Sequence, residues 1–253
     1  MELKDKSVIV TGGASGLGAA TSRLLARKGA KLAILDLNIG LARKIAEEVG
    51  GIAIECDVSS AKSGEEAMEK VKAANGTVRV LVNCAGIGDP KRIVSKEGPM
   101  PLEQFEKIIS VNLIGSFNMM RLVAAQMIAA DPMEDGERGV IISTASVAAY
   151  EGQIGQAAYS ASKGAIVSLT LPAAREFAQF GIRVNAIAPG LFSTPLLEGL
   201  SDEAKQSLAA AIPFPKRLGA AEEYAKLVKH IIGNRYINGE VIRIDGALRM
   251  QPK

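Results

Sequence analysis

Eight residues, Thr11-Gly12-Gly13-Ala14-Ser15-Gly16-Leu17-Gly18, follow a short apolar run and open an amphipathic stretch, and they decide how this chain folds. Glycines at positions 12, 16 and 18 allow a tight turn and a close approach of the backbone to a pyrophosphate, whose charge meets the N-terminus of the next helix. A tight turn without any ligand is the alternative. The position between a strand and a helix favours a nucleotide site.

The alternation of strand and helix continues along the chain. Apolar, β-branched segments predict seven parallel strands buried on both faces: Ser7–Val10, Lys31–Asp36, Gly51–Cys56, Val78–Asn83, Gly139–Ser143, Ile182–Ala188 and Glu240–Ile244. Amphipathic stretches between them predict helices: Gly16–Lys28, Ile39–Val49, Glu65–Ala74, Leu102–Ala129, Ala157–Gln179 and Ala220–Ile232. We therefore expect one α/β domain over residues 1–253, a doubly wound parallel sheet with helices on both faces.

Two segments interrupt this alternation. Gly88–Pro101 is rich in glycine, proline and lysine, and Pro189–Leu218 holds several prolines and one short helical piece. In doubly wound sheets, the loops that leave the carboxyl ends of the strands build the ligand crevice. These two segments are therefore the predicted walls of a substrate site.

Composition excludes several classes of protein. Of 253 residues, 48% are hydrophobic and 23% charged, which excludes disorder, and a net charge of +3 gives no reason to expect a nucleic-acid partner. No uninterrupted apolar run reaches the roughly 18 residues of a membrane span, so no membrane association is expected. A single histidine, His230, leaves little material for a metal site or a Ser-His-Asp triad, and no metal is expected.

The N-terminal segment and the two cysteines indicate in which cellular compartment the protein is expected. Cys56 and Cys84 lie far apart without a CxxC pattern, which indicates reduced thiols. A strand begins within a few residues of Met1 and leaves no room for a signal peptide. We expect a cytoplasmic protein, with the mitochondrial matrix as the alternative in a eukaryote.

Asp36 ends the second predicted strand, 24 residues after Gly12. A carboxylate at this position can accept hydrogen bonds from both ribose hydroxyls of NAD, and it repels the additional phosphate of NADP. An exposed carboxylate at the end of a strand is the alternative. The sequence favours NAD.

Polar residues after later strands are further candidates. Tyr159 and Lys163 are four residues apart on a predicted helix and share one face, so the ammonium would lower the phenol pKa towards that of a general base. Ser146 follows the fifth strand and could hydrogen-bond a substrate oxygen. Asn112 lies in the middle of a helix, where asparagine is unfavourable by propensity. Each has the alternative of an ordinary, satisfied polar residue.

Two short motifs complete the set. Asp57-Val58 after the third strand could contact an adenine amino group and face, although a local turn cap explains it equally well. Asn83-Cys84-Ala85-Gly86 ends the fourth strand, where small residues let the backbone approach a cofactor, or simply form a turn.

Together these motifs resemble the short-chain dehydrogenase/reductase family over essentially the whole chain. The matching residues are TGGASGLG, Asp57, NCAG at 83–86, Asn112, Ser146, YSASK at 159–163 and Pro189-Gly190. The resemblance implies a Rossmann-type fold of about seven strands, a catalytic tetrad and usually a homotetramer. The tetrad residues are Asn112, Ser146, Tyr159 and Lys163.

Longer stretches resemble the 3-hydroxyacyl-CoA dehydrogenases within this family, among them IAPGLFSTPLL at 187–197 and NGEVIRIDGALRMQP at 238–252. The likeness implies that Tyr159 is the base and Ser146 a substrate contact. The loop Gly88–Pro101 departs from this subfamily. The cofactor contacts expected from motifs and resemblance are Gly12, Ser15, Gly16, Leu17, Gly18, Asp36, Asp57, Val58, Cys84, Ala85, Gly86, Tyr159, Lys163, Phe192 and Thr194.

The resemblance thus implies NAD-dependent oxidation of the 3-hydroxyl of a short-chain 3-hydroxyacyl-CoA, including 2-methyl-branched ones. Asn112 is expected to hold a water for proton release, and Gln153 and Gln156 to contact the thioester. The loop Gly88–Pro101 also carries three basic residues that could contact the CoA phosphates, or could simply form a solvated basic loop: Lys91, Arg92 and Lys96. An apolar lid is expected from Leu191, Phe192, Leu196, Leu197 and Phe214. The rival functions are a 3-oxoacyl carrier-protein reductase, a hydroxysteroid dehydrogenase, and a non-catalytic NAD-binding scaffold or RNA-processing subunit.

Overall fold

A computed structural model describes residues 1–194 and 202–252 of the chain, without the side chains of residues 202, 204 and 205. The strands are β1 (Ser7–Thr11), β2 (Lys31–Asp36), β3 (Ile52–Glu55), β4 (Val78–Asn83), β5 (Val94–Ser95), β6 (Gly98–Pro99), β7 (Gly139–Thr144), β8 (Ile182–Pro189) and β9 (Val241–Ile244). The α-helices are α1 (Gly16–Ala26), α2 (Ile39–Val49), α3 (Ala61–Asn75), α4 (Leu102–Ile109), α5 (Gly115–Ile128), α6 (Ala157–Ala178), α8 (Asp202–Ala210) and α9 (Ala221–Gly233). Short helical turns are η1 (Ser110–Ile114), η2 (Glu134–Gly136) and η3 (Val147–Ala149).

Seven of the strands form one parallel sheet in the order β3-β2-β1-β4-β7-β8-β9. The predicted doubly wound α/β fold is therefore confirmed, and all seven predicted strands are present with small shifts at their ends. The strand order reverses between β1 and β4, since the chain adds strands outward from β1 on one side and from β4 on the other. Ligands of such sheets bind at the carboxyl ends of the strands beside this reversal.

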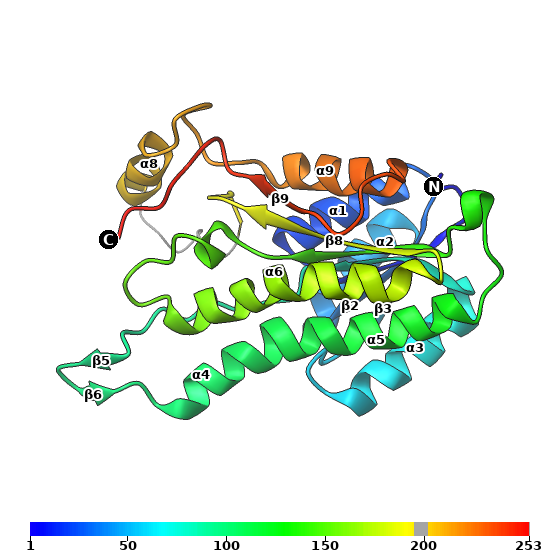
Figure 1. Cartoon of the computed structure of the whole chain (residues 1–253), viewed down its shortest axis with the longest axis horizontal. Coiled ribbons are helices and arrows are strands. Elements are labelled where there is room, and N and C mark those ends of the chain that lie inside the picture. The colour runs from blue at the N-terminus through cyan, green and yellow to red at the C-terminus, as the bar shows by residue number, and fades with distance from the viewer. Residues whose placement is uncertain (195–201, 253) are drawn as a thin grey trace.

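Successive residues of each strand face opposite layers of helices (Figure 1). Val8 and Val10 pack with α1, α2 and α9 on one face, whereas Ile9 between them packs with α3, α5 and α6 on the other. The strands are buried on both faces because both faces are covered. This explains why their sequences read as continuous apolar runs.

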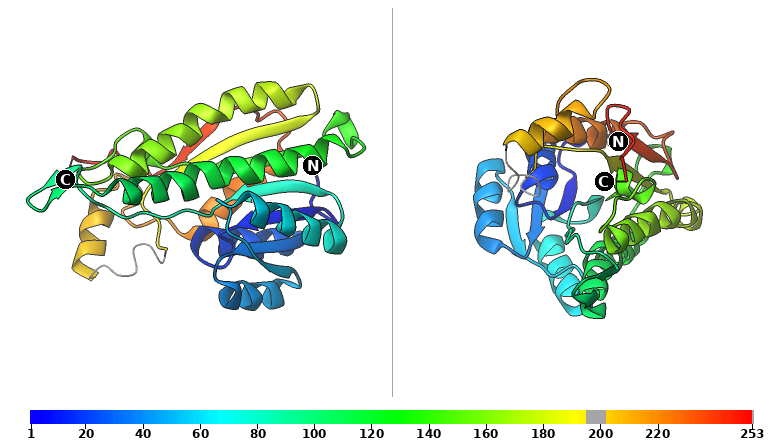
Figure 2. Two further views of the ribbon diagram at one scale, coloured as in Figure 1. Left: turned by 90° about the horizontal axis from the view of Figure 1, so that it is seen from below. Right: turned by 90° about the vertical axis from the view of Figure 1, so that its left-hand side faces the viewer.

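The sequence analysis missed or misplaced some elements. Helix α3 begins four residues before the predicted Glu65 because the Ser60 side chain accepts a hydrogen bond from Ser63 N and caps the helix. The segment Gly88–Pro101 contains a small antiparallel hairpin, β5–β6, which no pattern predicted. Figures 1 and 2 show this hairpin projecting from the same end of the molecule as the C-terminus and α8.

The continuous helical stretch Leu102–Ile128, formed by α4, η1 and α5, is long and apolar enough to cross a membrane by length and composition alone, with a mean hydropathy of 1.5. Half of its most apolar part is buried inside the protein. It packs against α3, α6 and the sheet. A core helix meets the same criterion, so the stretch is weak evidence for a membrane span.

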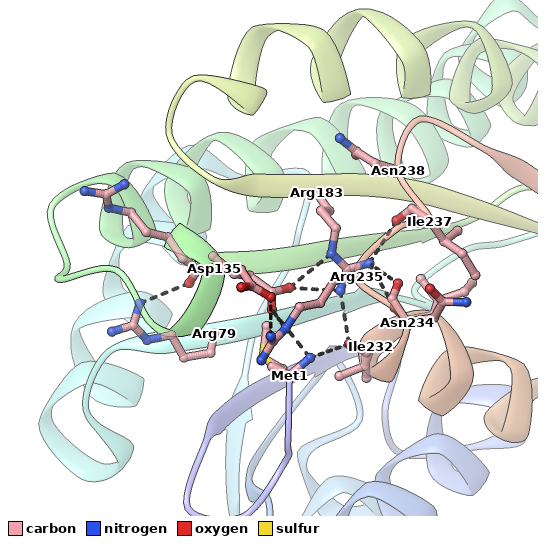
Figure 3. Close-up of polar contacts among 12 residues, drawn as sticks. Met1, Arg79, Asp135, Arg183, Ile232, Asn234, Arg235, Ile237 and Asn238 are labelled. Carbon is pink, nitrogen blue, oxygen red and sulfur yellow. Dashed lines mark hydrogen bonds and ion pairs between the residues drawn. The ribbon is translucent and has the colours of Figure 1, made fainter.

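A buried ion cluster joins the end of α9 to the amino ends of β7 and β8, opposite the carboxyl ends at which ligands bind (Figure 3). The Arg183 guanidinium donates to Glu137 Oε1 at 2.9 and 3.0 Å, and to the carbonyls of Ile231 and Ile232 at 2.9 and 3.0 Å. Those carbonyls belong to the last turn of α9, where the helix dipole favours a cation. Arg183 therefore fixes α9 to β8, and Tyr224 of α9 in turn hydrogen-bonds Thr144, which lines the cleft described below.

Candidate active site

A cleft of about 480 Å³ runs along the carboxyl ends of β1, β2, β3, β4, β7 and β8. Of the predicted catalytic residues, cofactor contacts and thioester contacts, all except Asn112 and Gln153 line this one cleft. They come from six separate strand ends and from α6. The parallel sheet brings them together because every strand ends at the same edge.

The glycine turn after β1 has no room for side chains. Gly12 has a φ of +61°, and a Cβ on it would lie 2.7 Å from the Ala85 Cα. A Cβ on Gly18 would lie 2.2 Å from the Gly12 carbonyl oxygen. Ser15 at the N-cap of α1 makes no capping hydrogen bond with its side chain, so the first amides of the helix face the cleft without that partner. Such a turn fits a pyrophosphate.

Asp36 lies at the end of β2 in the wall of the cleft. Its Oδ2 accepts a hydrogen bond from Ala14 N at 3.1 Å, and its Oδ1 accepts one from Asn38 N at 2.9 Å. The glycine turn therefore holds the carboxylate in a fixed orientation. Each oxygen has a further lone pair that can accept from a ribose hydroxyl.

Asp57 and Val58 lie in the cleft at the end of β3. Asp57 Oδ1 accepts from Ser59 N at 2.9 Å and Ser59 Oγ at 2.6 Å, as the turn-cap alternative predicted. Val58 is buried against Gly115, whose absent side chain leaves room for it. The pair thus has a local structural role as well as a place in the cleft.

Tyr159 and Ser146 meet in the middle of the cleft. Burial raises the pKa of Tyr159, and a hydrogen bond from the Ser146 hydroxyl lowers it in part. Ser146 Oγ accepts from Ala148 N at 3.1 Å, so its own proton is free to donate. The phenol is therefore held neutral in the free protein, with one built-in donor ready to stabilise its deprotonated form.

Lys163 lies beside Tyr159 with its Nζ 5.7 Å from the centre of the phenol ring. Burial lowers the pKa of Lys163 to about 8. Its ammonium donates to the Thr144 carbonyl at 2.7 Å. The predicted lowering of the Tyr159 pKa by Lys163 is not among the causes that set this pKa in the free protein, where burial has the largest effect and raises it.

Thr144 belongs to a buried network that the sequence analysis did not identify. Its Oγ1 donates to the Asn83 carbonyl at 2.6 Å and accepts from the hydroxyl of the fully buried Tyr224 at 2.7 Å. The Cys84 sulfur lies 3.7 Å from the same Oγ1, and burial raises the pKa of this thiol. The network joins α9 to the carboxyl ends of β4 and β7, next to Lys163.

Asn112 is fully buried and does not line the cleft. Its amide group is fully engaged: Oδ1 accepts from Ile87 N at 2.8 Å, and Nδ2 donates to Ile87 O at 2.9 Å and Ser162 Oγ at 3.0 Å. It lies in η1, one turn of π-helix, a form that is frequent at functional sites. The Asn112 side chain therefore holds the loop after β4 in place. The sequence signal for a special role was an asparagine in the middle of a helix, where this residue is unfavourable.

The predicted substrate contacts are only partly brought together. Gln156 lines the cleft, whereas the Gln153 side chain donates to the Gln251 carbonyl at 3.0 Å and lies outside it. Met250, from the C-terminal segment, lines the cleft and was not predicted.

The loop residues divide in the same way. Of the expected lid, Leu191 and Phe192 line the cleft, Phe214 is 82% exposed, and Leu196 and Leu197 lie outside the described residues. The three basic residues of the hairpin loop do not line the cleft: Lys91, Arg92 and Lys96.

The cleft fits an extended dinucleotide. The turn at Gly12–Gly18 matches a pyrophosphate, Asp36 matches a ribose, and the buried Lys163 matches a second ribose beside Tyr159. The groups in the cleft best suited to proton transfer are Ser146, Tyr159 and Lys163. Together they suit proton removal from an alcohol beside a hydride acceptor.

Comparison with known proteins agrees with this geometry. Residues 6–205 match the family model of the short chain dehydrogenases. The chain is 51% identical to bovine (Bos taurus) and 50% to human (Homo sapiens) 3-hydroxyacyl-CoA dehydrogenase type-2; each comparison covers 99% of this chain and 97% of the other. The crystal structure of 3-hydroxyacyl-CoA dehydrogenase type-2 from Mycobacterium avium superposes with a TM-score of 0.93 at 44% identity, covering 98% of this chain and 97% of that one.

Proposed function

The chain belongs to the short-chain dehydrogenase family, and from this premise we propose that it oxidises the 3-hydroxyl of short-chain 3-hydroxyacyl-CoA thioesters to the 3-oxo form with NAD. As a member of this family it is an oxidoreductase, and the family generally uses NAD(H). The observation that carries the substrate proposal is the similarity to 3-hydroxyacyl-CoA dehydrogenases over 99% of the chain.

The cofactor would be held by the strand ends of the cleft. The turn Gly12–Gly18 would bind the pyrophosphate, Asp36 the adenosine ribose and Lys163 the nicotinamide ribose. When bound, the cofactor supplies the hydride acceptor.

Side chains of the protein accept and stabilise the proton that leaves the 3-hydroxyl. Tyr159, once deprotonated, takes the proton of the 3-hydroxyl at its phenol oxygen. Ser146 donates a hydrogen bond to the substrate oxygen on which charge develops, by turning its proton from Tyr159, its partner in the free protein, while Ala148 N holds its Oγ in place. Lys163 carries its positive charge below about pH 8, 5.7 Å from the centre of the Tyr159 ring. It does not lower the Tyr159 pKa in the free protein, and its part in the proposal is to favour the phenolate once cofactor and substrate are bound. Asn112 fixes the loop at Ile87, and the water that it was expected to hold remains a prediction.

The test is the rate of NADH formation when the purified protein is mixed with NAD or NADP and 3-hydroxybutyryl-CoA. A 2-methyl-branched 3-hydroxyacyl-CoA and estradiol are run beside it. We expect turnover of both thioesters with NAD and little with NADP. Turnover of estradiol alone would favour a hydroxysteroid dehydrogenase, and a preference for NADPH with a carrier-protein thioester would favour a reductase. NAD binding without turnover of any of these substrates would favour the scaffold alternative.

Replacement of Asp36 tests the choice of cofactor. In an Asp36→Ala variant we expect kcat/KM with NAD to fall about 10–100-fold, because the loss of hydrogen bonds to a charged acceptor costs about 1.5–3 kcal/mol. Discrimination against NADP should fall with it, since the repelling charge is gone. Glu55→Gln is the matched control, because Glu55 is exposed on the neighbouring strand and does not line the cleft. An unchanged ratio of NAD to NADP efficiencies would mean that Asp36 does not bind the ribose.

We further propose a homotetramer in the cytoplasm. Exposed apolar side chains on the outer helices support contact between copies: Leu102, Phe117 and Leu171 are 65%, 49% and 44% exposed. The free cysteines support a reducing compartment. Contact of Lys91, Arg92 and Lys96 with the CoA phosphates is part of the same proposal, supported by their place on the hairpin loop at the end of the molecule where the C-terminus lies (Figure 2).

A further inference from the structure

The C-terminal segment is pinned across the reacting end of the cleft. After β9, Gly246 and Ala247 both adopt left-handed conformations, with φ of +59° and +65°, and turn the chain back. Leu248 is then buried, at 2% exposed, and Met250 reaches the cleft. A Cβ on Gly246 would lie 2.7 Å from Ile212 Cγ2, so the turn depends on glycine.

An ion-pair cluster fixes this turn to the loop that leads into α6. Arg243 donates to both carboxylate oxygens of Glu151 at 2.7 and 2.9 Å, to Asp245 at 2.7 Å and to the Leu248 carbonyl at 3.0 Å. Its guanidinium also lies 5.2 Å from the ring centre of Tyr150. The bidentate geometry gives this contact a defined orientation as well as energy.

Two backbone acceptors of the C-terminal segment complete the attachment. The Gln251 carbonyl accepts from Gln153 Nε2, and the Pro252 carbonyl accepts from Ile154 N, each at 3.0 Å. Met250 therefore sits between a buried anchor at Leu248 and two hydrogen bonds just beyond it. Its position in the wall is fixed by the fold.

The same segment is tied to both predicted substrate walls. The Gly246 carbonyl accepts from Phe214 N at 3.3 Å, in the segment Pro189–Leu218. The loop that holds the C-terminal segment also binds the other wall, because Lys91 N donates to the Gly155 carbonyl at 2.8 Å. Figures 1 and 2 show the C-terminus and the β5–β6 hairpin at one end of the molecule.

Met250 lies on the substrate half of the cleft. It follows β9, the edge strand on the side of β4, β7 and β8, whereas the glycine turn and Asp36 follow β1 and β2 on the other side of the reversal. The same cleft is lined by Gln156 and Tyr159, on the loop and helix that follow the point where Gln153 holds the C-terminal segment. An apolar side chain there would face the acyl group beyond the reacting carbon.

We infer that Met250 determines which acyl chains the enzyme accepts, and that Glu151 and Arg243 are positioning residues that hold it in place. The inference rests on the proposed acyl-CoA substrate and goes beyond it by naming what limits the acyl group. Met250 is unbranched and apolar, and its length sets the depth left for the substrate. One methylene more or less in such a pocket changes kcat/KM about tenfold or more.

The test compares 3-hydroxyacyl-CoA substrates with acyl chains of about four, six and eight carbons, two methylenes apart at each step. They are measured with wild type, Met250→Ala and Met250→Phe. We expect Met250→Ala to raise the ratio of long-chain to short-chain kcat/KM at least about tenfold, and Met250→Phe to lower it. The ratio is measured within one preparation, so partial unfolding cannot change it. Met133→Ala, the same truncation at a partly buried site outside the cleft, is the control and should keep the wild-type ratio.

Glu151→Gln tests the attachment. We expect KM for every thioester to rise about tenfold with little change in kcat, while the NADH dissociation constant, measured by fluorescence titration, stays at the wild-type value (a charge-assisted pair at about 1.5 kcal/mol). A merely structural role would lower the melting temperature and leave KM unchanged, and that result would overturn the positioning role. Unchanged chain-length ratios in both Met250 variants would overturn the inference. A wild-type enzyme that turns over no thioester at all would instead refute the proposed function.

Discussion

Replacement of Tyr159 by phenylalanine is expected to lower kcat about 10²–10⁴-fold, the contribution typical of a well-placed general acid or base. The change removes only the phenol oxygen, and the ring that packs in the cleft beside Lys163 remains. The NADH dissociation constant and the melting temperature should therefore stay close to wild type. The measurements are initial rates of NADH formation with saturating 3-hydroxybutyryl-CoA, a fluorescence titration with NADH, and a thermal melt.

The control for this variant is Tyr236→Phe. Tyr236 is fully exposed and lies outside the cleft, so the same loss of a hydroxyl should leave the rate unchanged. If Tyr159→Phe kept more than about a tenth of the wild-type kcat, the phenol would contribute less than general-base catalysis normally supplies. Another group in the cleft would then have to take the proton.

The second large effect concerns stability. In an Arg183→Met variant we expect the free energy of unfolding to fall by about 3–5 kcal/mol, because the buried Glu137 loses its nearest cation and two buried carbonyls lose a donor. The Met1 ammonium and Arg235 Nε, at 3.4 and 3.3 Å from Glu137 Oε2, compensate only in part. Arg183 and Glu137 have side chains only 8% and 5% exposed, and the guanidinium also satisfies the carbonyls of Ile231 and Ile232 (Figure 3). In a chain of this size the loss corresponds to a fall in Tm of roughly 6–20 °C.

Arg23→Met is the matched control. Arg23 pairs with Glu48 in a similar bidentate geometry, with distances of 2.8 Å, but the two side chains are 39% and 51% exposed. Exposed pairs contribute little because water and salt screen them, so this variant should melt close to wild type. Both melts are run at one protein concentration, since assembly of copies shifts the apparent stability. Equal falls in Tm for the two variants would mean that the burial of the Arg183–Glu137 pair does not make its loss more costly than the loss of an exposed pair.

The double variant Arg183→Met with Glu137→Gln separates the two causes. If the cost arises mainly because the buried Glu137 charge has lost its nearest cation, neutralising Glu137 as well should restore part of the lost Tm, less the contribution of the ion pairs that Glu137 makes with Met1 and Arg235. If it arises from the carbonyls at the end of α9, the double variant should melt no higher than Arg183→Met.

The sequence alone determined the sheet, the order of its strands along the chain, and the edge where the site lies. These features follow from local patterns: apolar runs between amphipathic stretches, and a glycine turn whose close contacts leave no room for a side chain. It also supplied most of the cleft, because residues at the ends of parallel strands must meet at one edge.

Only the tertiary structure decided how the remaining residues act. The sequence placed Asn112 among the catalytic residues, but packing turned its amide to Ile87 and away from the cleft. It gave no sign of Met250, because that residue reaches the site through a contact between Gln153 and Gln251, 98 positions apart. Such contacts depend on sheet register and on the path of the chain after its last strand. A local sequence pattern cannot predict these contacts, because the two partners are far apart along the chain and come close only when it has folded.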